Sequence, residues 1–333
     1  MPKATGFLDR IAAGDTLVYA SGYCIELERR GYQQAGSWVP EVVLEHPEVV
    51  AQLHREWVHA GSDIVVALTY FGLKEKLDLV GRGEDMEKLN KIAVKLAREV
   101  ADETGTLMAG CIANTTIYDH DPVKNKDRAA QIFKEQVEWA VEGGADLIIA
   151  ETFASLGEAK LALNAIKKNG NGLPCIVMLA PNKTRLTFDG VPYVNALTQL
   201  YQAGADVVGL NCNFGPATII PEIRKIRQQL KAPMACVPVP FQTTPDLPSW
   251  QELRRHHYDL SEYFENYDSL ASTMRDIDVF GKACLDIGGV QVVGICCGNS
   301  GRHTRALAHA IGKTVPSARY RPNMSLPGAY GSG

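Results

Sequence analysis

Three features that would each assign this 333-residue sequence to a class are missing from it. No apolar run approaches the roughly 18–20 residues that a membrane-spanning helix needs. Residues 1–10 lack the apolar core of a secretory signal peptide. The formal net charge is only -4, which gives no electrostatic reason to expect nucleic acid or an anionic membrane as a partner. We therefore expect a cytoplasmic protein whose partners are small molecules.

The eight cysteines do not indicate a disulfide framework, because the chain is long and carries no secretory signal. Five of them are expected to be small buried apolar residues of the core: Cys24, Cys111, Cys175, Cys236 and Cys284. The other three stand in a different context, described below.

A short sequence pattern, a glycine followed by a small residue and a run of β-branched residues, occurs four times. The glycine is typical of a helix C-cap, and a run that is apolar on both faces is typical of a buried parallel strand. The copies lie at residues 59–66, 142–149, 202–209 and, more loosely, 286–293. Further strands are expected at 16–20, 106–111, 174–179 and 233–237, and helices at 47–60, 86–104, 129–143, 156–168, 193–203, 220–230, 270–287 and 302–311.

Eight alternating strand and helix units predict an α/β fold of the (β/α)8 TIM-barrel type. The alternative is an open doubly wound sheet, but no Gly-rich dinucleotide-binding fingerprint follows the first expected strand. We expect one barrel over residues 1–313 and an irregular tail over 314–333. Residues 238–269 form a long connection after the seventh strand, and such a loop covers a site or joins a partner subunit.

Cysteines follow two of the expected strands at their carboxyl ends, where a barrel carries its chemistry. Cys212 follows the strand that starts at Val207, and the pair Cys296 and Cys297 follows the last strand. Adjacent cysteines form a disulfide with each other only with strain. Three thiolates with one coordination position left open are the ligand set of a catalytic zinc ion. The alternative is that the pair consists of two core thiols.

The cysteine segments, together with motifs elsewhere in the chain, resemble the zinc-dependent homocysteine S-methyltransferases, above all the betaine-dependent branch of that family. The resemblance runs from about Leu8 to Ile311. Its further motifs are Ile25–Tyr32, Ala35–Glu41, Glu45–Glu48, Gln52–Glu56 and Ile149–Phe153.

The resemblance implies roles for individual residues. Cys212, Cys296 and Cys297 would be the ligands of Zn2+. Glu151 would be the catalytic-site acid that holds the amino group of the acceptor, with Ser21 and Gly22 also in the acceptor site. Two asparagines at strand ends, Asn114 and Asn211, are expected to support these groups by hydrogen bonds.

A methyl donor for a thiolate must be an onium compound, whose positive charge disappears in the reaction. Proteins hold such a cation against aromatic faces. Trp38 follows the first strand, and Tyr70 and Phe71 end the second, so these aromatic residues are expected at the donor site. The resemblance implies that Thr152, which follows Glu151, also contacts the donor.

The chain also departs from the pattern that it resembles. Ala20 stands where the family has an aspartate that contacts the amino group of homocysteine. Thr152 replaces a tyrosine, the order of Tyr70 and Phe71 is reversed, and the long C-terminal arm of the betaine enzyme has no counterpart after Thr314. The last difference leaves homo-oligomerisation open.

The sequence therefore predicts an S-methyltransferase that moves a methyl group from a small onium donor, with glycine betaine favoured, to homocysteine, giving dimethylglycine and methionine. One alternative keeps the zinc chemistry but uses a sulfonium donor, such as S-methylmethionine or dimethylsulfoniopropionate, or a different thiol acceptor. Another is an onium-binding protein without catalytic activity.

Overall fold

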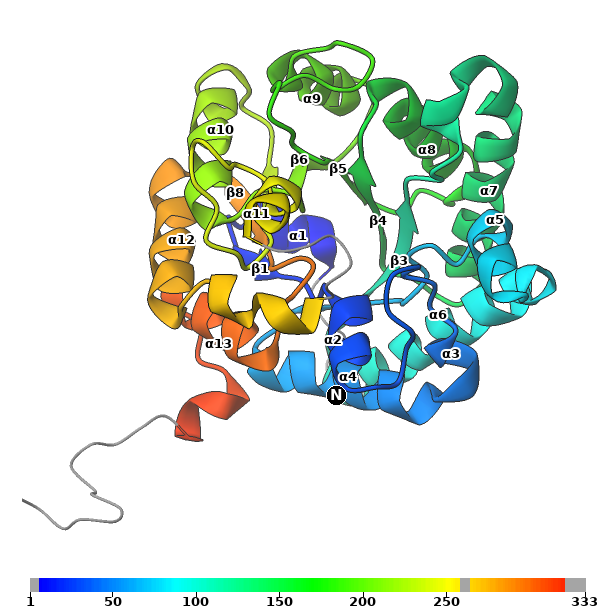
Figure 1. Cartoon of the computed structure of the whole chain (residues 1–333), viewed down its shortest axis with the longest axis horizontal. Helices are drawn as coiled ribbons and strands as arrows, with labels where there is room; N and C mark the ends of the chain where they lie inside the picture. The colour runs from blue at the N-terminus through cyan, green and yellow to red at the C-terminus, as the bar shows by residue number, and fades with distance from the viewer. Residues whose placement is uncertain (1–5, 258–263, 321–333) are drawn as a thin grey trace, which may run out of the picture.

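A closed barrel of parallel strands forms the centre of the computed structural model, which describes residues 6–257 and 264–320 (Figure 1). Within these residues the sheet has eight strands in the order β1-β8-β7-β6-β5-β4-β3-β2. Hydrogen bonds from Asp63 N–H to the Val18 carbonyl and from Ala20 N–H to the Ile64 carbonyl join β1 to β2 and close the ring. The strands are β1 (Leu17–Val18), β2 (Ile64–Val66), β3 (Leu107–Ala113), β4 (Leu147–Phe153), β5 (Cys175–Leu179), β6 (Val207–Asn211), β7 (Met234–Val237) and β8 (Val290–Val293). The predicted TIM barrel is confirmed.

Helices surround the strands on the outside of the barrel (Figure 1). Their bounds are α1 (Phe7–Ala12), α2 (Tyr23–Arg29), α3 (Val42–Glu45), α4 (Pro47–Ala60), α5 (Lys74–Leu77), α6 (Met86–Thr104), α7 (Pro122–Glu142), α8 (Leu156–Asn169), α9 (Tyr193–Gln202), α10 (Pro216–Gln229), α11 (Trp250–His257), α12 (Met274–Ile287) and α13 (Gly301–Ala310). Short 3-10 helices include η4 (Phe264–Leu270) and η5 (Pro316–Tyr320).

Three helices begin at residues other than those expected, and local capping chemistry explains each difference. Helix α7 starts seven residues before the expected Ala129, because the Asp121 side chain accepts the Lys124 N–H and Pro122 fits the first turn. Helix α10 likewise starts at a proline, Pro216. Helix α12 starts four residues after the expected position, where Thr273 and Asp276 form a capping box.

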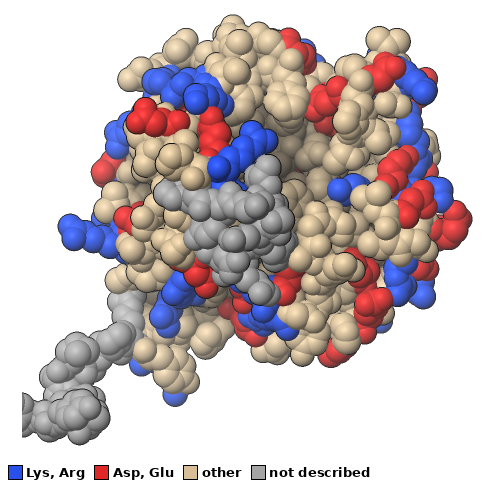
Figure 2. Space-filling view, in the orientation of Figure 1, with Lys and Arg blue, Asp and Glu red and all other residues tan. Residues whose placement is uncertain are grey.

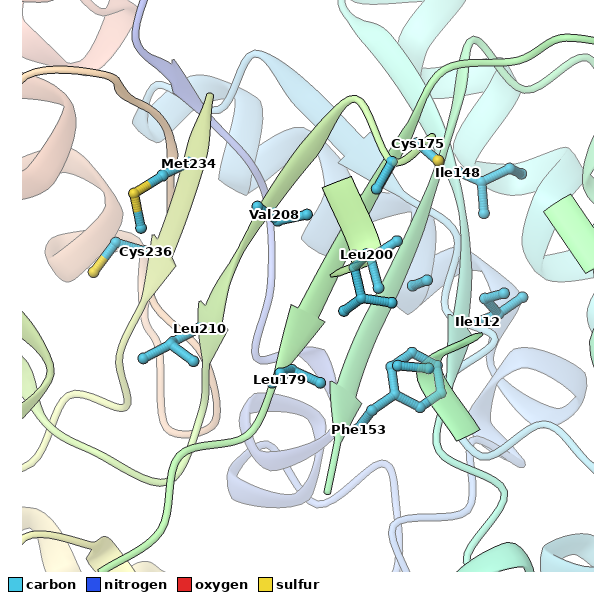
Figure 3. Close-up of a cluster of buried hydrophobic side chains, with 14 of the residues drawn as sticks. Ile112, Ile148, Phe153, Cys175, Leu179, Leu200, Val208, Leu210, Met234 and Cys236 are labelled. Atoms are coloured by element: carbon cyan, nitrogen blue, oxygen red, sulfur yellow. The ribbon is translucent and has the colours of Figure 1, made fainter. Parts of the chain in front are cut away.

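The outward-facing side of the strands packs against the helices and forms one of two buried layers. Leu179, Leu210 and Cys236 belong to this layer, and so does Leu200 of α9 (Figure 3). Successive side chains of a strand face opposite sides, so the alternate residues face the barrel interior. Tyr19, Cys111 and Ile149 belong to this second, interior layer. The same alternation directs Glu151 and Asn211 inward at the strand ends.

The long connection after β7 contains structure that the sequence pattern did not reveal. It includes α11 and η4, and α11 is seen in front of the strand ends (Figure 1). Residues 258–263 of this connection and residues 321–333 of the expected tail lie outside the described residues. In the described part of the chain, no helix combines the length and the apolar character required to cross a bilayer.

Candidate active site

A cavity of about 250 Å³ opens at the carboxyl ends of the strands. The face of the molecule that carries it is hollowed near its centre, where the visible surface comes mostly from uncharged residues (Figure 2). The side chains around the cavity come from six of the eight strand ends and from α11. Of the predicted site residues, all but Asn211 line it: Ser21, Gly22, Trp38, Tyr70, Phe71, Asn114, Glu151, Thr152, Cys212, Cys296 and Cys297. Among the described lining residues none is Lys, Arg or His.

Three thiols meet in the cavity, and we call Cys212, Cys296 and Cys297 the thiol cluster. All three sulfur atoms lie within 4.8 Å of one another. The Sγ–Sγ distance is 3.7 Å from Cys212 to Cys297 and 3.8 Å from Cys296 to Cys297. Tetrahedral zinc with Zn–S bonds of about 2.3 Å would place its sulfur ligands about 3.8 Å apart. The donor set and its spacing therefore fit a zinc ion.

The ionisation of the thiol cluster is linked from one sulfur to the next. Hydrogen bonds from Cys296 and Cys297 hold the pKa of Cys212 well below its usual value. The pKa values of Cys296 and Cys297 are raised. The main cause is the hydrogen bond that each makes to the Cys212 sulfur, and burial and neighbouring charge add to it. One thiolate forms easily here, and a cation is needed to stabilise three.

The turn at Ser21 and Gly22 lies directly against the thiol cluster. The Asn299 side-chain amide donates to the Ser21 carbonyl at 3.0 Å. Gly22 has a φ of 81°, and a Cβ there would lie 2.7 Å from the Cys296 carbonyl oxygen. The position therefore requires glycine for both its backbone conformation and the close approach.

Glu151 lies near the end of β4, and the residue is only 5% exposed. Its Oε2 accepts hydrogen bonds from the Tyr19 hydroxyl at 3.3 Å and the Asn211 amide at 3.0 Å. Its Oε1 accepts one from the Cys111 thiol at 3.3 Å. Burial, and next the charge of Cys296, raise the pKa of Glu151 to about 8. A bound cation would favour the ionised form of this carboxyl group.

The two predicted asparagines hold the strand end that carries Glu151. Asn114 donates to the Thr152 carbonyl at 2.9 Å. Asn211 accepts the Thr152 N–H at 2.9 Å and donates to the Thr152 hydroxyl at 2.7 Å. The pairing of β4 with β5 is irregular between Ala150 and Phe153, and these asparagines satisfy the backbone groups that the irregularity frees.

The predicted aromatic residues line the cavity, although Tyr70 and Phe71 lie in a turn beyond the end of β2 rather than in the strand itself. Their ring centroids are 4.4 Å apart. The ammonium of Lys76 lies 4.4 Å from the Phe71 centroid, so one face of that ring is already occupied.

Sequence reasoning missed several residues of the cavity wall. Trp250 and Gln251 of α11 line it, and they lie in the connection for which no periodic pattern was found. Cys24 and Cys111, expected as core residues, also line it. The only signal for Cys111 was its inward-facing position near the end of β3.

Left-handed backbone conformations concentrate in this wall. Eight non-glycine residues of the described chain have a positive φ. Five of them line the cavity: Trp38, Phe71, Thr152, Cys212 and Asn213. Each such conformation costs on the order of 1–3 kcal/mol and persists where the surrounding structure fixes it, most often at functional sites.

Comparisons with known proteins agree with this arrangement. The sequence profile described as homocysteine S-methyltransferase matches residues 17–311. Betaine–homocysteine S-methyltransferase 1 of Mus musculus is 32% identical over 98% of this chain and 79% of its own length. The S-methylmethionine–homocysteine S-methyltransferase BHMT2 of Pongo abelii is 32% identical over 98% of this chain and 86% of its own.

Solved structures of the homocysteine methyltransferase MmuM from Escherichia coli share the fold. The oxidised form gives a TM-score of 0.71 at 17% identity, over 91% of this chain and 98% of that one. The metallated form gives 0.68 at 18% identity, over 90% and 98%. At these identities the likeness concerns the fold alone, whereas the profile match spans most of the sequence. The chain belongs to the homocysteine S-methyltransferase family.

Proposed function

We propose that this protein is a zinc-dependent methyltransferase that moves a methyl group from a small onium donor to the sulfur of a thiol. The observation that carries the proposal is the thiol cluster, whose three sulfurs lie within 4.8 Å of one another beside an aromatic-lined cavity. Homocysteine is the proposed acceptor and glycine betaine the favoured donor, giving methionine and dimethylglycine. The mouse relative is named for that pair of substrates.

The thiol cluster would hold Zn2+ through its three sulfur atoms, which leaves one tetrahedral position open. When bound there, zinc supplies Lewis acidity that lowers the pKa of an acceptor thiol, so that the nucleophilic thiolate is available at neutral pH.

Glu151 orients the acceptor in this proposal. Its carboxylate receives the ammonium of homocysteine, and the hydrogen bonds from Tyr19, Cys111 and Asn211 fix its position. The turn at Ser21 and Gly22 confines the acceptor backbone beside Cys296, because Gly22 leaves no room for a side chain there. Such fixed placement reduces the entropy cost of bringing the two reactants together.

Trp38, Tyr70, Phe71 and Thr152 form the donor side of the cavity. The aromatic rings face a cation without hydrogen-bonding to its charged centre, and no basic side chain among the described lining residues opposes it. The acceptor sulfur uses a lone pair to form a bond with the methyl carbon. The carbon–nitrogen bond breaks in the same step, and its electron pair stays on nitrogen as the neutral amine. No covalent intermediate with the enzyme is required.

A second candidate keeps this chemistry with another substrate. The Pongo relative is named for S-methylmethionine, and a sulfonium donor would meet the same aromatic wall. Ala20 at the cavity, together with the hydrogen bonds that Glu151 already accepts from the protein, favours testing thiol acceptors that lack an amino group.

The test combines metal analysis of reduced, purified protein with a methyl-transfer assay using glycine betaine and homocysteine. We expect one zinc per chain and formation of methionine. Zinc without methionine would move the proposal to sulfonium donors and other thiols, tested in the same assay. Protein that binds no zinc after reduced preparation would overturn the proposal.

A further inference from the structure

The connection between β7 and α12 places a second indole in the wall of the cavity. Trp250, the first residue of α11, lines it together with Trp38. Their ring centroids are 6.2 Å apart and the ring planes meet at 60°. Two indoles at this angle form a corner, which can contact a compact cation on two sides. Trp is the aromatic residue with the strongest attraction for cations.

We propose that Trp250 is a specificity-determining residue that recognises the positive charge of the methyl donor. This inference rests on the proposed function and adds to it a residue from a segment outside the predicted donor site. It also assigns a role to α11, as a part of the donor site.

The surroundings of the other aromatic rings support this assignment. One face of Phe71 is occupied by Lys76, which reduces the aromatic surface that Phe71 can offer to a second cation. Trp250 is only 6% exposed, and it lines the cavity. Attraction between a cation and a ring is larger in such a desolvated place than at an exposed one.

Helix α11 is fixed to the backbone that carries Cys212. The backbone N–H of Trp250 donates to the Asn213 carbonyl at 2.8 Å. The side-chain amide of Gln251 donates to the side-chain oxygen of Asn213 at 2.7 Å. Phe214 and Ser249 form an isolated β-bridge beside these contacts. The indole is therefore held at a defined place relative to the thiol cluster, and it does not depend on a freely moving loop.

Charge recognition can be separated from shape with two pairs of ligands. Glycine betaine pairs with 3,3-dimethylbutanoate, which replaces the quaternary nitrogen by carbon, and dimethylsulfoniopropionate pairs with 4-methylpentanoate. Binding is measured by calorimetry without an acceptor thiol, in a phosphine reductant, on zinc-loaded and on metal-free protein. The readout is the ratio of the two dissociation constants within a pair, so turnover is not needed.

For the pair that contains the donor, we expect the wild-type protein to bind the cation more tightly than its neutral isostere. Trp250→Leu should reduce that ratio roughly tenfold, whereas Trp250→Phe should reduce it only about twofold. Trp139→Leu removes a half-buried indole of α7, away from the cavity, and should leave the ratio unchanged.

Two results would overturn the proposal in distinguishable ways. A Trp250→Leu protein that is folded and keeps the wild-type ratio would refute the role of Trp250 and leave the methyltransferase assignment intact. A wild-type protein that prefers neither cation to its isostere would refute an onium site in this cavity, and with it both the proposed donor class and the role of Trp250.

Discussion

The hydroxyl of Tyr19 donates to Oε2 of Glu151 across the interior of the barrel, over 3.3 Å. Tyr19 comes directly after β1 and Glu151 lies in β4, so the contact joins opposite parts of the ring. Both residues are buried. Because Glu151 is the acidic residue proposed to bind the acceptor, this hydrogen bond determines where its carboxylate lies.

Replacing Tyr19 by Phe should therefore impair use of the acceptor more than use of the donor. Loss of one buried hydrogen bond typically costs about 0.5–1.5 kcal/mol, so we expect KM for homocysteine to rise roughly two- to tenfold while KM for the donor stays the same. Glu151→Gln, which removes the charge itself, should have the larger effect. Steady-state kinetics with each substrate varied in turn measures both, and equal changes in the two KM values would contradict a positioning role.

Single Cys→Ser substitutions in the thiol cluster should each release the metal. A serine hydroxyl remains protonated where a thiol ionises, so it is a poor zinc ligand. We expect less than one zinc per chain and loss of methyl transfer in all three variants. Cys284→Ala is the control, because Cys284 lies in the buried layer between the strands and the helices. This variant should retain both the zinc and the methyl-transfer activity. A cluster variant with full zinc content would remove that residue from the ligand set.

Ala20→Asp tests whether the acceptor carries an amino group. A charge-assisted hydrogen bond to an ammonium is worth about 1.5–3 kcal/mol, so kcat/KM for homocysteine should rise roughly ten- to a hundredfold. Ala20→Asn introduces a side chain of nearly the same size as aspartate but without its charge, and it should give little of this gain. If 3-mercaptopropionate, a thiol without an amino group, is the better substrate for the wild type, the acceptor class differs from the one proposed.

His54 should make the fold less stable in acid. It is fully buried beneath α2, with Nδ1 2.9 Å from the Tyr23 hydroxyl, and burial lowers its pKa to about 3. In the unfolded chain this histidine takes up a proton near its ordinary pKa of 6.5, whereas in the folded chain it stays neutral at that pH. The stability that depends on a neutral His54 is thus fully present above pH 6.5, and it is lost as the pH falls from there towards 3.

Between pH 7 and pH 5 this single residue should cost about 2 kcal/mol of unfolding free energy. Urea unfolding at the two pH values measures the loss. His54→Gln removes the titrating group, so the difference between the two pH values should shrink by that amount. His303, whose pKa burial lowers to about 4, remains in the variant and gives a residual acid dependence of the same sign.

The parts of the site that the sequence predicted are those attached to strand ends. Cys212 and Cys296 follow strands with apolar runs, so the barrel order brings them to one rim. Glu151 was predicted from the family resemblance. Tyr19 could not be assigned in this way, because a tyrosine in a buried strand has the same pattern whether it packs or donates a hydrogen bond. Its role depends on the carboxylate of Glu151, which lies three strands further along the chain.

Trp250 and Gln251 were missed for a different reason. Helix α11 has only eight residues, and it is held by contacts to Asn213 and Phe214 that are distant in sequence. Such an element is stabilised by tertiary packing and leaves no extended periodic signal. The starts of α7 and α12 were misplaced because their caps, at Asp121 and Thr273, decide the boundary and the apolar period does not.

The pairing of β8 with both β1 and β7 has a consequence for how the protein matures. Cys296 and Cys297 follow β8, and that strand pairs with the first strand on one side and with the seventh on the other. During synthesis, Cys212 would emerge long before its two partners and offer a single thiol. The three thiols come together only where the ring is closed, so a metal ion held by all three would report a finished barrel.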